Sequence, residues 1–198
     1  NSFTLDTSQS AGLDKALKKA IDRAYKNIYA FHQAQKREKI EVEIESGVTC
    51  WQEPVPIEKV GLYIPGGSAP LFSSVLMLGI PAQIAKCAEI ILMTPPSKTG
   101  SSGTAIHPGI LYAAYKCGIT SVYTIGGAQA IAAMTCGTET IPEVDKLFGP
   151  GNQYVTAAKQ HALQLGKGID MPAGPSELLV FADAGAETSF VAADLLSQ

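Results

Sequence analysis

The sequence predicts an α/β fold, in which a Rossmann-like parallel sheet is flanked by helices and preceded by an N-terminal helix and short strands. From about residue 57, short apolar segments alternate with longer segments of helical periodicity, the pattern of a parallel sheet with helices on its faces. Several of the apolar segments also end in turns rich in glycine and proline, as tight connections between strand and helix require.

The first 56 residues have a different pattern. Apolar residues recur at three- and four-residue steps over residues 13–38, which predicts an amphipathic helix. EVEIE at 41–45 alternates acidic and apolar residues, as a half-exposed strand does, and VTCWQEPVP at 48–56 is expected to continue as a second strand or an extended arm. We assign residues 1–56 to an N-terminal helix and extended arm, part of a flanking domain.

The central part repeats a unit of strand, turn and helix about four times, and we assign residues 57–176 to a Rossmann-like α/β domain. The predicted strands are VGLYI (60–64), EIILM (89–93), SVYTI (121–125) and the start of DKLFGPGN (145–152). The predicted helices are SVLMLGIPAQIAKC (74–87), ILYAAYKCG (110–118), AIAAMTCG (130–137) and QYVTAAKQHALQL (153–165). The small polar residues SKTGSSGT at 97–104 predict a surface loop.

Composition and charge exclude several classes of function. Of the 198 residues 46% are apolar and 17% are charged, which is a globular rather than a disordered composition. The net charge is −3 and the densest basic run is KREK at 36–39, so we expect no nucleic-acid partner. No apolar run reaches the roughly 18 residues of a membrane span, and no secretory signal opens the chain. We therefore expect a cytoplasmic protein without a membrane partner.

The cysteines and histidines form no evident metal or catalytic motif. There is no CxxC pair, so we expect the cysteines to be reduced and buried. We expect the histidines at the surface, where none is a convincing general base. The residues concerned are Cys50, Cys87, Cys117, Cys136, His32, His107 and His161.

Both ends suggest a piece of a longer protein. The chain starts at Asn1 rather than at Met, and the helical pattern ETSFVAADLLSQ runs to Gln198 without a Gly, Asn or Pro to end it. We therefore expect further sequence in the parent protein.

Four loops that follow predicted strands predict a ligand crevice. IPGG, IGGAQ, FGPGN and MPAGPS are rich in glycine and proline, and loops after parallel strands gather at one edge of the sheet, where ligands bind. Neither GxGxxG after a strand nor GxxxxGK[ST] occurs, so a conventional dinucleotide or P-loop motif is absent. Tight turns need glycine in any case. We expect Gly149 and Gly151 to leave room for a ligand.

Few polar residues occur in these loops, and they are the candidate ligand contacts. Asn152 could instead cap the following helix and Ser176 a turn, so both alternatives stay open. Glu177 is the only carboxylate in a candidate ligand loop, so any paired acid and base are expected outside this sequence. The candidates are Tyr63, Gln129, Asn152, Ser176 and Glu177.

Three long segments resemble the histidinol dehydrogenase family. They are VGLYIPGGSAPLFSSVLMLGIPAQIA, GGAQAIAAMTCGTETIPEVDKLFGPGNQYVTAAK and IDMPAGPSELLVFAD, and ADLLSQ at the end is also similar. The resemblance implies zinc- and NAD-dependent oxidation of L-histidinol to L-histidine through L-histidinaldehyde, with a Glu–His pair as acid and base. It also implies a domain-exchanged homodimer with two incomplete Rossmann-like domains, of which residues 177–198 would begin the second, truncated one.

The resemblance assigns roles to matching residues only. Tyr63, Gln129 and Asn152 fall where the family contacts NAD, Ser176 and Gln198 fall where it contacts substrate, and Gln198 also matches a zinc ligand. No residue of this sequence matches the catalytic pair or the other zinc ligands. Zinc sites need three or four protein ligands, so we expect the chain alone to hold no zinc and to be inactive. A non-catalytic nucleotide-binding module or a scaffold remains the alternative.

Overall fold

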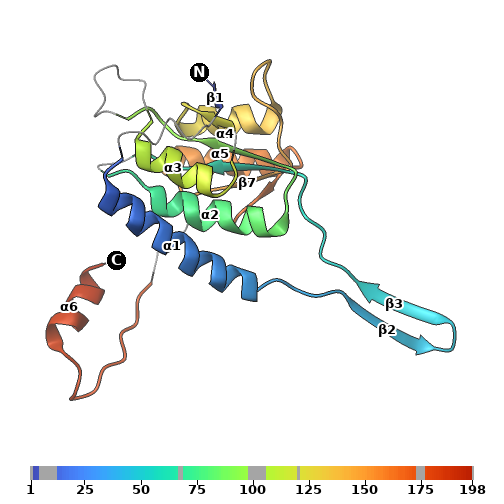
Figure 1. Cartoon of the computed structure of the whole chain (residues 1–198), viewed down its shortest axis with the longest axis horizontal. Helices are drawn as coiled ribbons and strands as arrows, with labels where there is room; N and C mark the ends of the chain where they lie inside the picture. Colours follow the sequence, from blue (N-terminus) through green and yellow to red (C-terminus); the bar gives the residue numbers. More distant parts are fainter. Residues whose placement is uncertain are drawn as a thin grey trace.

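The computed structural model describes residues 2–4, 13–66, 69–97, 106–119, 121–172 and 177–197 (Figure 1). The strands are β1 (Ser2–Thr4), β2 (Ile40–Glu45), β3 (Val48–Gln52), β4 (Lys59–Tyr63), β5 (Glu89–Met93), β6 (Ser121–Tyr123), β7 (Lys146–Phe148) and β8 (Gly168–Ile169). The helices are α1 (Lys15–Ala34), α2 (Phe72–Ala85), α3 (Pro108–Lys116), α4 (Gly127–Cys136), α5 (Gln153–Gln164) and α6 (Thr188–Leu196).

The main sheet confirms the predicted α/β fold. Its strands lie in the order β1-β6-β5-β4-β7-β8. Strands β4 to β8 pair in parallel, and β1, which was not predicted, adds to β6 in the antiparallel direction. From β4 the chain first builds outward through β5 to β6 and then returns to add β7 and β8 on the other side. This reversal is the switch point of a doubly wound sheet and lies between β4 and β7.

Side chains along a strand point alternately to the two faces of the sheet. Each face therefore packs in a separate core with its own group of helices. Leu62 and Ile64 pack in the core formed with α1, α2 and α3. Tyr63, between them in the sequence, packs in the core formed with α4 and α5. Figure 1 shows α1, α2 and α3 together on one face of the sheet.

The predicted helix over residues 13–38 is confirmed, although it ends earlier, at Ala34. Its start is set by Asp14, whose Oδ2 accepts hydrogen bonds from the backbone N–H groups of Ala16 and Leu17, each at 3.1 Å. Such a side chain satisfies donors that the first turn of a helix leaves unpaired.

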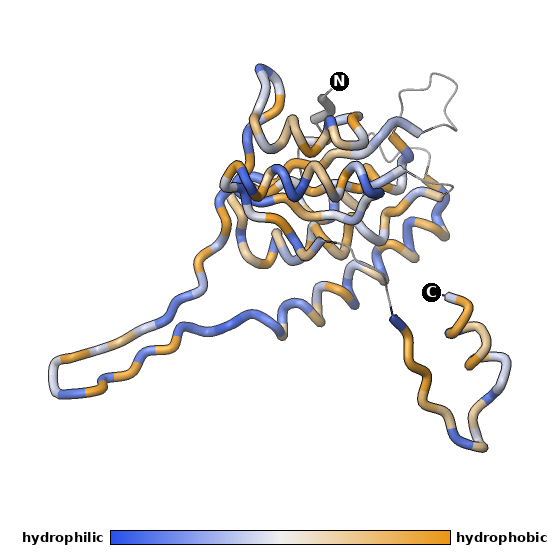
Figure 2. The backbone as a smooth tube through the Cα atoms, turned by 180° about the vertical axis from the view of Figure 1, so that it is seen from behind, coloured by the Kyte–Doolittle hydropathy of each residue, from blue (hydrophilic) through white to orange (hydrophobic). Residues whose placement is uncertain are grey.

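Strands β2 and β3 form an antiparallel hairpin that projects from the body of the molecule (Figures 1 and 2). The two predicted strands are therefore confirmed. Every residue of the hairpin is exposed, including Trp51 with 67% of its surface accessible. The alternating pattern predicted one covered face, and within the described part of the chain neither face is covered.

The last described segment stands apart from the sheet in the same way. Residues 177–183 have no regular secondary structure, and a turn at residues 184–186 leads into α6, which confirms the predicted final helix. Most apolar side chains of this segment are exposed, with Phe181 at 99% and Leu179 at 89% accessible. Figure 2 shows this run of hydrophobic residues. The domain boundary at residue 176 stays a prediction.

The structure corrects two expectations about single residue types. Cys117 is buried as predicted and Cys87 is partly buried, but the prediction is wrong for Cys50 and Cys136, which are exposed on the hairpin and at the end of α4. His107 was expected at the surface but is half-buried, and its Nδ1 accepts from the Gly109 N–H at 3.0 Å and so caps α3. Residues 98–104 of the predicted surface loop lie outside the described part of the chain.

Candidate functional site

Three of the predicted site residues lie at the carboxyl edge of the parallel sheet. Tyr63 ends β4, Gln129 lies in the first turn of α4 after β6, and Asn152 precedes α5 after β7. Ser176 and Gln198 lie outside the described residues, so their predicted roles are untested. Glu177 is exposed at the start of the C-terminal segment.

Tyr63 and Gln129 meet at the N-terminus of α4. The Tyr63 ring is buried, with 4% of the residue accessible, and its hydroxyl accepts a hydrogen bond from the Gly127 N–H at 3.0 Å. The exposed Gln129 side chain folds over the same residue, since a Cβ added to Gly127 would lie 2.8 Å from Gln129 Oε1. The fold thus joins the end of β4 to the start of α4, although 64 residues separate them.

Asn152 caps α5, which confirms the structural alternative considered for it. Its Oδ1 accepts from the backbone N–H groups of Tyr154 and Val155, each at 3.1 Å. Because the residue is exposed and only its oxygen is used in the cap, the amide nitrogen is available as a donor to a ligand. Capping and ligand contact are therefore compatible.

The expectation that Gly149 and Gly151 leave room for a ligand is wrong, because protein atoms occupy that space. Gly149 has a φ of +136°, and a Cβ there would lie 2.0 Å from the Tyr63 carbonyl oxygen. A Cβ on Gly151 would lie 2.3 Å from the Val155 side chain. Glycine at these positions lets the loop between β7 and α5 pack directly against the end of β4 and the first turn of α5.

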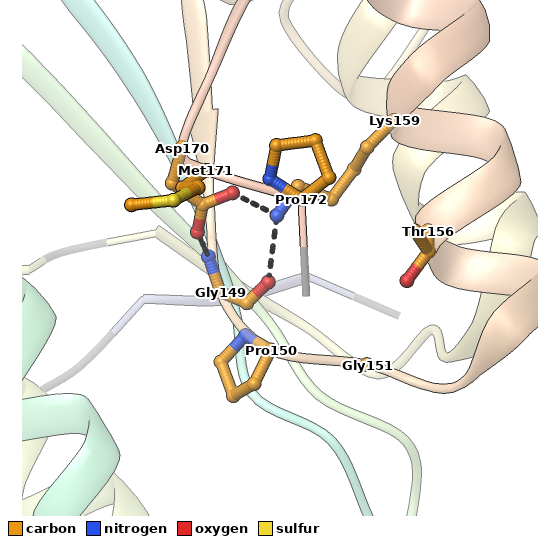
Figure 3. A pocket seen from close by; sticks show the side chains of 8 residues that line it. All are labelled: Gly149, Pro150, Gly151, Thr156, Lys159, Asp170, Met171 and Pro172. Carbon is orange, nitrogen blue, oxygen red and sulfur yellow. Dashed lines mark hydrogen bonds and ion pairs between the residues drawn. The ribbon is translucent and has the colours of Figure 1, made fainter. Parts of the chain in front are cut away.

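A cavity of about 200 Å³ lies beside this loop, and Figure 3 shows the residues that line it. Lys159 of α5 is 6% accessible, and its Nζ donates to the Gly149 carbonyl oxygen at 3.0 Å and forms an ion pair with Asp170 Oδ1. Asp170 Oδ2 in turn accepts from the Gly149 N–H at 2.8 Å. The remaining lining residues are Pro150, Gly151, Thr156, Met171 and Pro172.

Lys159 and Asp170 were not among the residues predicted from the sequence, although the pattern of α5 carried a signal for Lys159. Val155, Lys159 and Ala162 are the buried residues of α5, and their spacing of four and three places them on one helix face. A lysine within an apolar stripe requires a partner when the helix packs, because an unpaired charge is costly to bury.

The described residues do not provide a metal centre. Across these ranges no group of three or more His, Cys, Asp and Glu side chains could hold a metal ion. Gln198, to which the resemblance assigns zinc, falls outside them. The donor groups of the described residues therefore do not form a zinc site by themselves.

Within the described ranges, none of the helices is both long enough and apolar enough to cross a lipid bilayer.

A doubly wound parallel sheet with polar side chains at its switch point defines a Rossmann-like α/β protein, a class in which ligands bind at that edge. The sequence profile of the family described as histidinol dehydrogenase matches residues 4–198. Because this match covers nearly the whole chain, the chain belongs to the histidinol dehydrogenase family.

Individual relatives agree with this assignment. Histidinol dehydrogenase of Bacteroides fragilis strain YCH46 is 61% identical over 182 residues, 92% of this chain and 42% of the relative. The putative histidine biosynthesis bifunctional protein HisCD of Photorhabdus laumondii is 60% identical over 94% of this chain and 22% of its own length. The crystal structure of histidinol dehydrogenase from Elizabethkingia anophelis matches 98% of this chain and 45% of that chain, with a TM-score of 0.89 and 55% identity. The chain thus spans less than half the length of these relatives.

Proposed function

We propose that the protein containing this chain oxidises L-histidinol to L-histidine through L-histidinaldehyde, using NAD and zinc, and that this chain supplies the NAD side of the site. The names of the relatives support the reaction. The observation that supports the NAD side is the placement of Tyr63, Gln129 and Asn152 at the carboxyl edge around the switch point.

The hydrogen-bonding groups of the described residues are suited to bind a dinucleotide. The Gln129 amide is exposed and can both donate and accept. The amide nitrogen of Asn152 lies at the N-terminus of α5, where backbone N–H groups and the helix dipole favour an anionic or acceptor group. Tyr63, which is buried, holds the start of α4 in place through Gly127.

When bound, NAD accepts a hydride from the substrate in each of the two oxidations. The residues of this chain bind and orient the cofactor. This binding contributes to catalysis because it holds the reacting atoms close together. Ser176 and Gln198 are proposed as substrate contacts and Gln198 as a zinc ligand. We also propose that the whole protein is a cytoplasmic homodimer. The 198-residue chain is proposed to be inactive alone, because none of its residues matches the Glu–His pair of the family. No observation on the described residues favours the non-catalytic or scaffold alternative.

Substitutions at Asn152 test the NAD assignment in the full-length protein, because the two functions of this side chain use different atoms. Asn152→Asp keeps the oxygen that caps α5 but replaces the amide donor with a negative charge. We expect unchanged stability and NAD binding weakened roughly tenfold or more, the effect of losing one hydrogen bond to a charged group. Isothermal titration calorimetry measures the NAD affinity, and zinc content should not change.

A matched control separates loss of the cap from loss of the ligand contact. Asp14→Ala removes a cap of the same geometry from α1, which packs on the opposite face of the sheet from α5. It should lower the free energy of unfolding by about 1 kcal/mol and leave the NAD affinity as it was. NAD binding by Asn152→Asp that equals the wild type would count against the assigned contact.

A further inference from the structure

The contacts of Lys159, Asp170 and Gly149 form a closed ring of three interactions. Lys159 Nζ donates to the Gly149 carbonyl, Asp170 accepts from the Gly149 N–H, and the two side chains form an ion pair (Figure 3). Lys159 comes from α5, and Asp170 directly follows β8. The backbone N–H of Asp170 donates to the Leu147 carbonyl at 3.1 Å and so continues the pairing of β8 with β7. The backbone N–H and C=O of Gly149 are thus held by opposite charges.

Stability alone does not explain this ion pair. The Lys159 side chain is 7% accessible and that of Asp170 is 28% accessible, so both lose much of their hydration. A buried ion pair regains that loss only in part, and apolar side chains of similar size often stabilise a protein as well or better. Val155 and Ala162, on the same face of α5, are apolar. What the pair adds at this position is a fixed geometry for the residue that it holds.

The residue that it holds lies between two proposed cofactor contacts. Gly149 packs against the carbonyl of Tyr63, and Asn152 follows three residues later at the start of α5. A shift of the Gly149 peptide would therefore move Asn152 relative to Tyr63. Holding a binding loop in its bound geometry raises affinity, because less order has to be imposed when the ligand arrives.

We propose that Lys159 and Asp170 are positioning residues that act as one unit to hold the loop from Gly149 to Asn152 in the geometry that binds NAD. This inference rests on the NAD site proposed above. Both side chains bind the backbone of Gly149, so the role proposed for them is to position the loop and not to contact the cofactor. Met171 and Pro172, which follow Asp170, line the same cavity, so the pair also connects the loop after β8 to the loop after β7.

The test compares Lys159→Met, Asp170→Asn and the double variant in the full-length protein. Each single change breaks the ion pair while keeping the size of the side chain nearly constant. We expect the Michaelis constant for NAD and its dissociation constant to rise roughly tenfold in both single variants, the effect of about one charge-assisted hydrogen bond. The double variant should be no worse than the single variants, because the residues form one unit. The Michaelis constant for histidinol and kcat should stay within about twofold of the wild type.

Lys167→Met is the matched control, because it removes a second lysine–carboxylate pair, with Glu143, away from the Gly149 loop. It should leave all kinetic constants unchanged. A lower kcat with an unchanged Michaelis constant for NAD would indicate only a smaller folded fraction and would overturn the proposal. A loss confined to Lys159→Met would also overturn it, because that result would mean direct contact between the ammonium group and the cofactor.

The same experiment separates this inference from the proposed reaction. Wild-type protein that binds NAD but does not oxidise histidinol would refute the reaction, and the NAD dissociation constants of the variants would still decide the role of the pair. Wild-type protein that binds no NAD would refute both.

Discussion

Gly149→Ala should destabilise the protein more than other glycine substitutions at positive φ. An alanine at a φ of +136° is strained by about 1–3 kcal/mol. Its Cβ would also lie 2.0 Å from the Tyr63 carbonyl oxygen, a backbone atom of a central strand that has little freedom to move. Relief of such overpacking costs about another 1–3 kcal/mol. We therefore expect the free energy of unfolding to fall by about 2–6 kcal/mol.

The assay is urea unfolding of the full-length variants, followed by circular dichroism at a fixed protein concentration. Gly166→Ala is the matched control: Gly166 has a φ of +84° just after α5, and a Cβ there would meet no atom within 4 Å among the described residues. This change should lower the free energy of unfolding by only about 1–2 kcal/mol. Equal losses in the two variants would refute the argument, because the contact with Tyr63 would then impose no constraint.

Two further predictions concern ionisable side chains. Burial, reinforced by the hydrogen bond to Asp22, raises the pKa of Tyr112 to about 12. A raised pKa stabilises the fold below the tyrosine pKa of the unfolded chain, about 10, so wild-type stability should fall relative to Tyr112→Phe as the pH rises from about 10 to 12. Parallel urea midpoints for the two proteins over this range would contradict the prediction. Burial also raises the pKa of Cys117 to about 12. In the 198-residue chain at pH 8, iodoacetamide followed by mass spectrometry should modify Cys50 and Cys136, and Cys117 only after urea is added; labelling of Cys117 at the same rate without urea would show that its burial is not maintained.

Most of the secondary structure could be predicted because it depends on local patterns. The three- and four-residue spacing in α1 and the apolar segment EIILM in β5 each identify an element without reference to distant residues. Asn152 was a predictable helix cap for the same reason, since its two hydrogen bonds reach only two and three residues ahead. β1 was not predicted, because three residues carry too little pattern to identify a strand.

The site was only partly predictable, because its contacts join distant segments. The edge of the sheet where Tyr63, Gln129 and Asn152 lie was inferred correctly from the loops that follow the strands. The glycines of the β7–α5 loop were misinterpreted, because the sequence shows that a side chain is absent but not which atoms fill its place. At Gly149 the atoms that occupy the place of a side chain belong to Tyr63, 86 positions earlier in the sequence.

Local sequence patterns were enough to identify the helices, the longer strands, the parallel character of the sheet and the family resemblance, because periodicity and motifs are properties of neighbouring residues. The folded structure was needed to show that β7 lies beside β4, which brings Gly149 against Tyr63. It was also needed to show that Lys159 pairs with Asp170, since a helical stripe shows that a residue faces inward but does not identify the charged residue that it contacts. The order of the strands is set by packing between distant segments, and that order places the proposed cofactor contacts together.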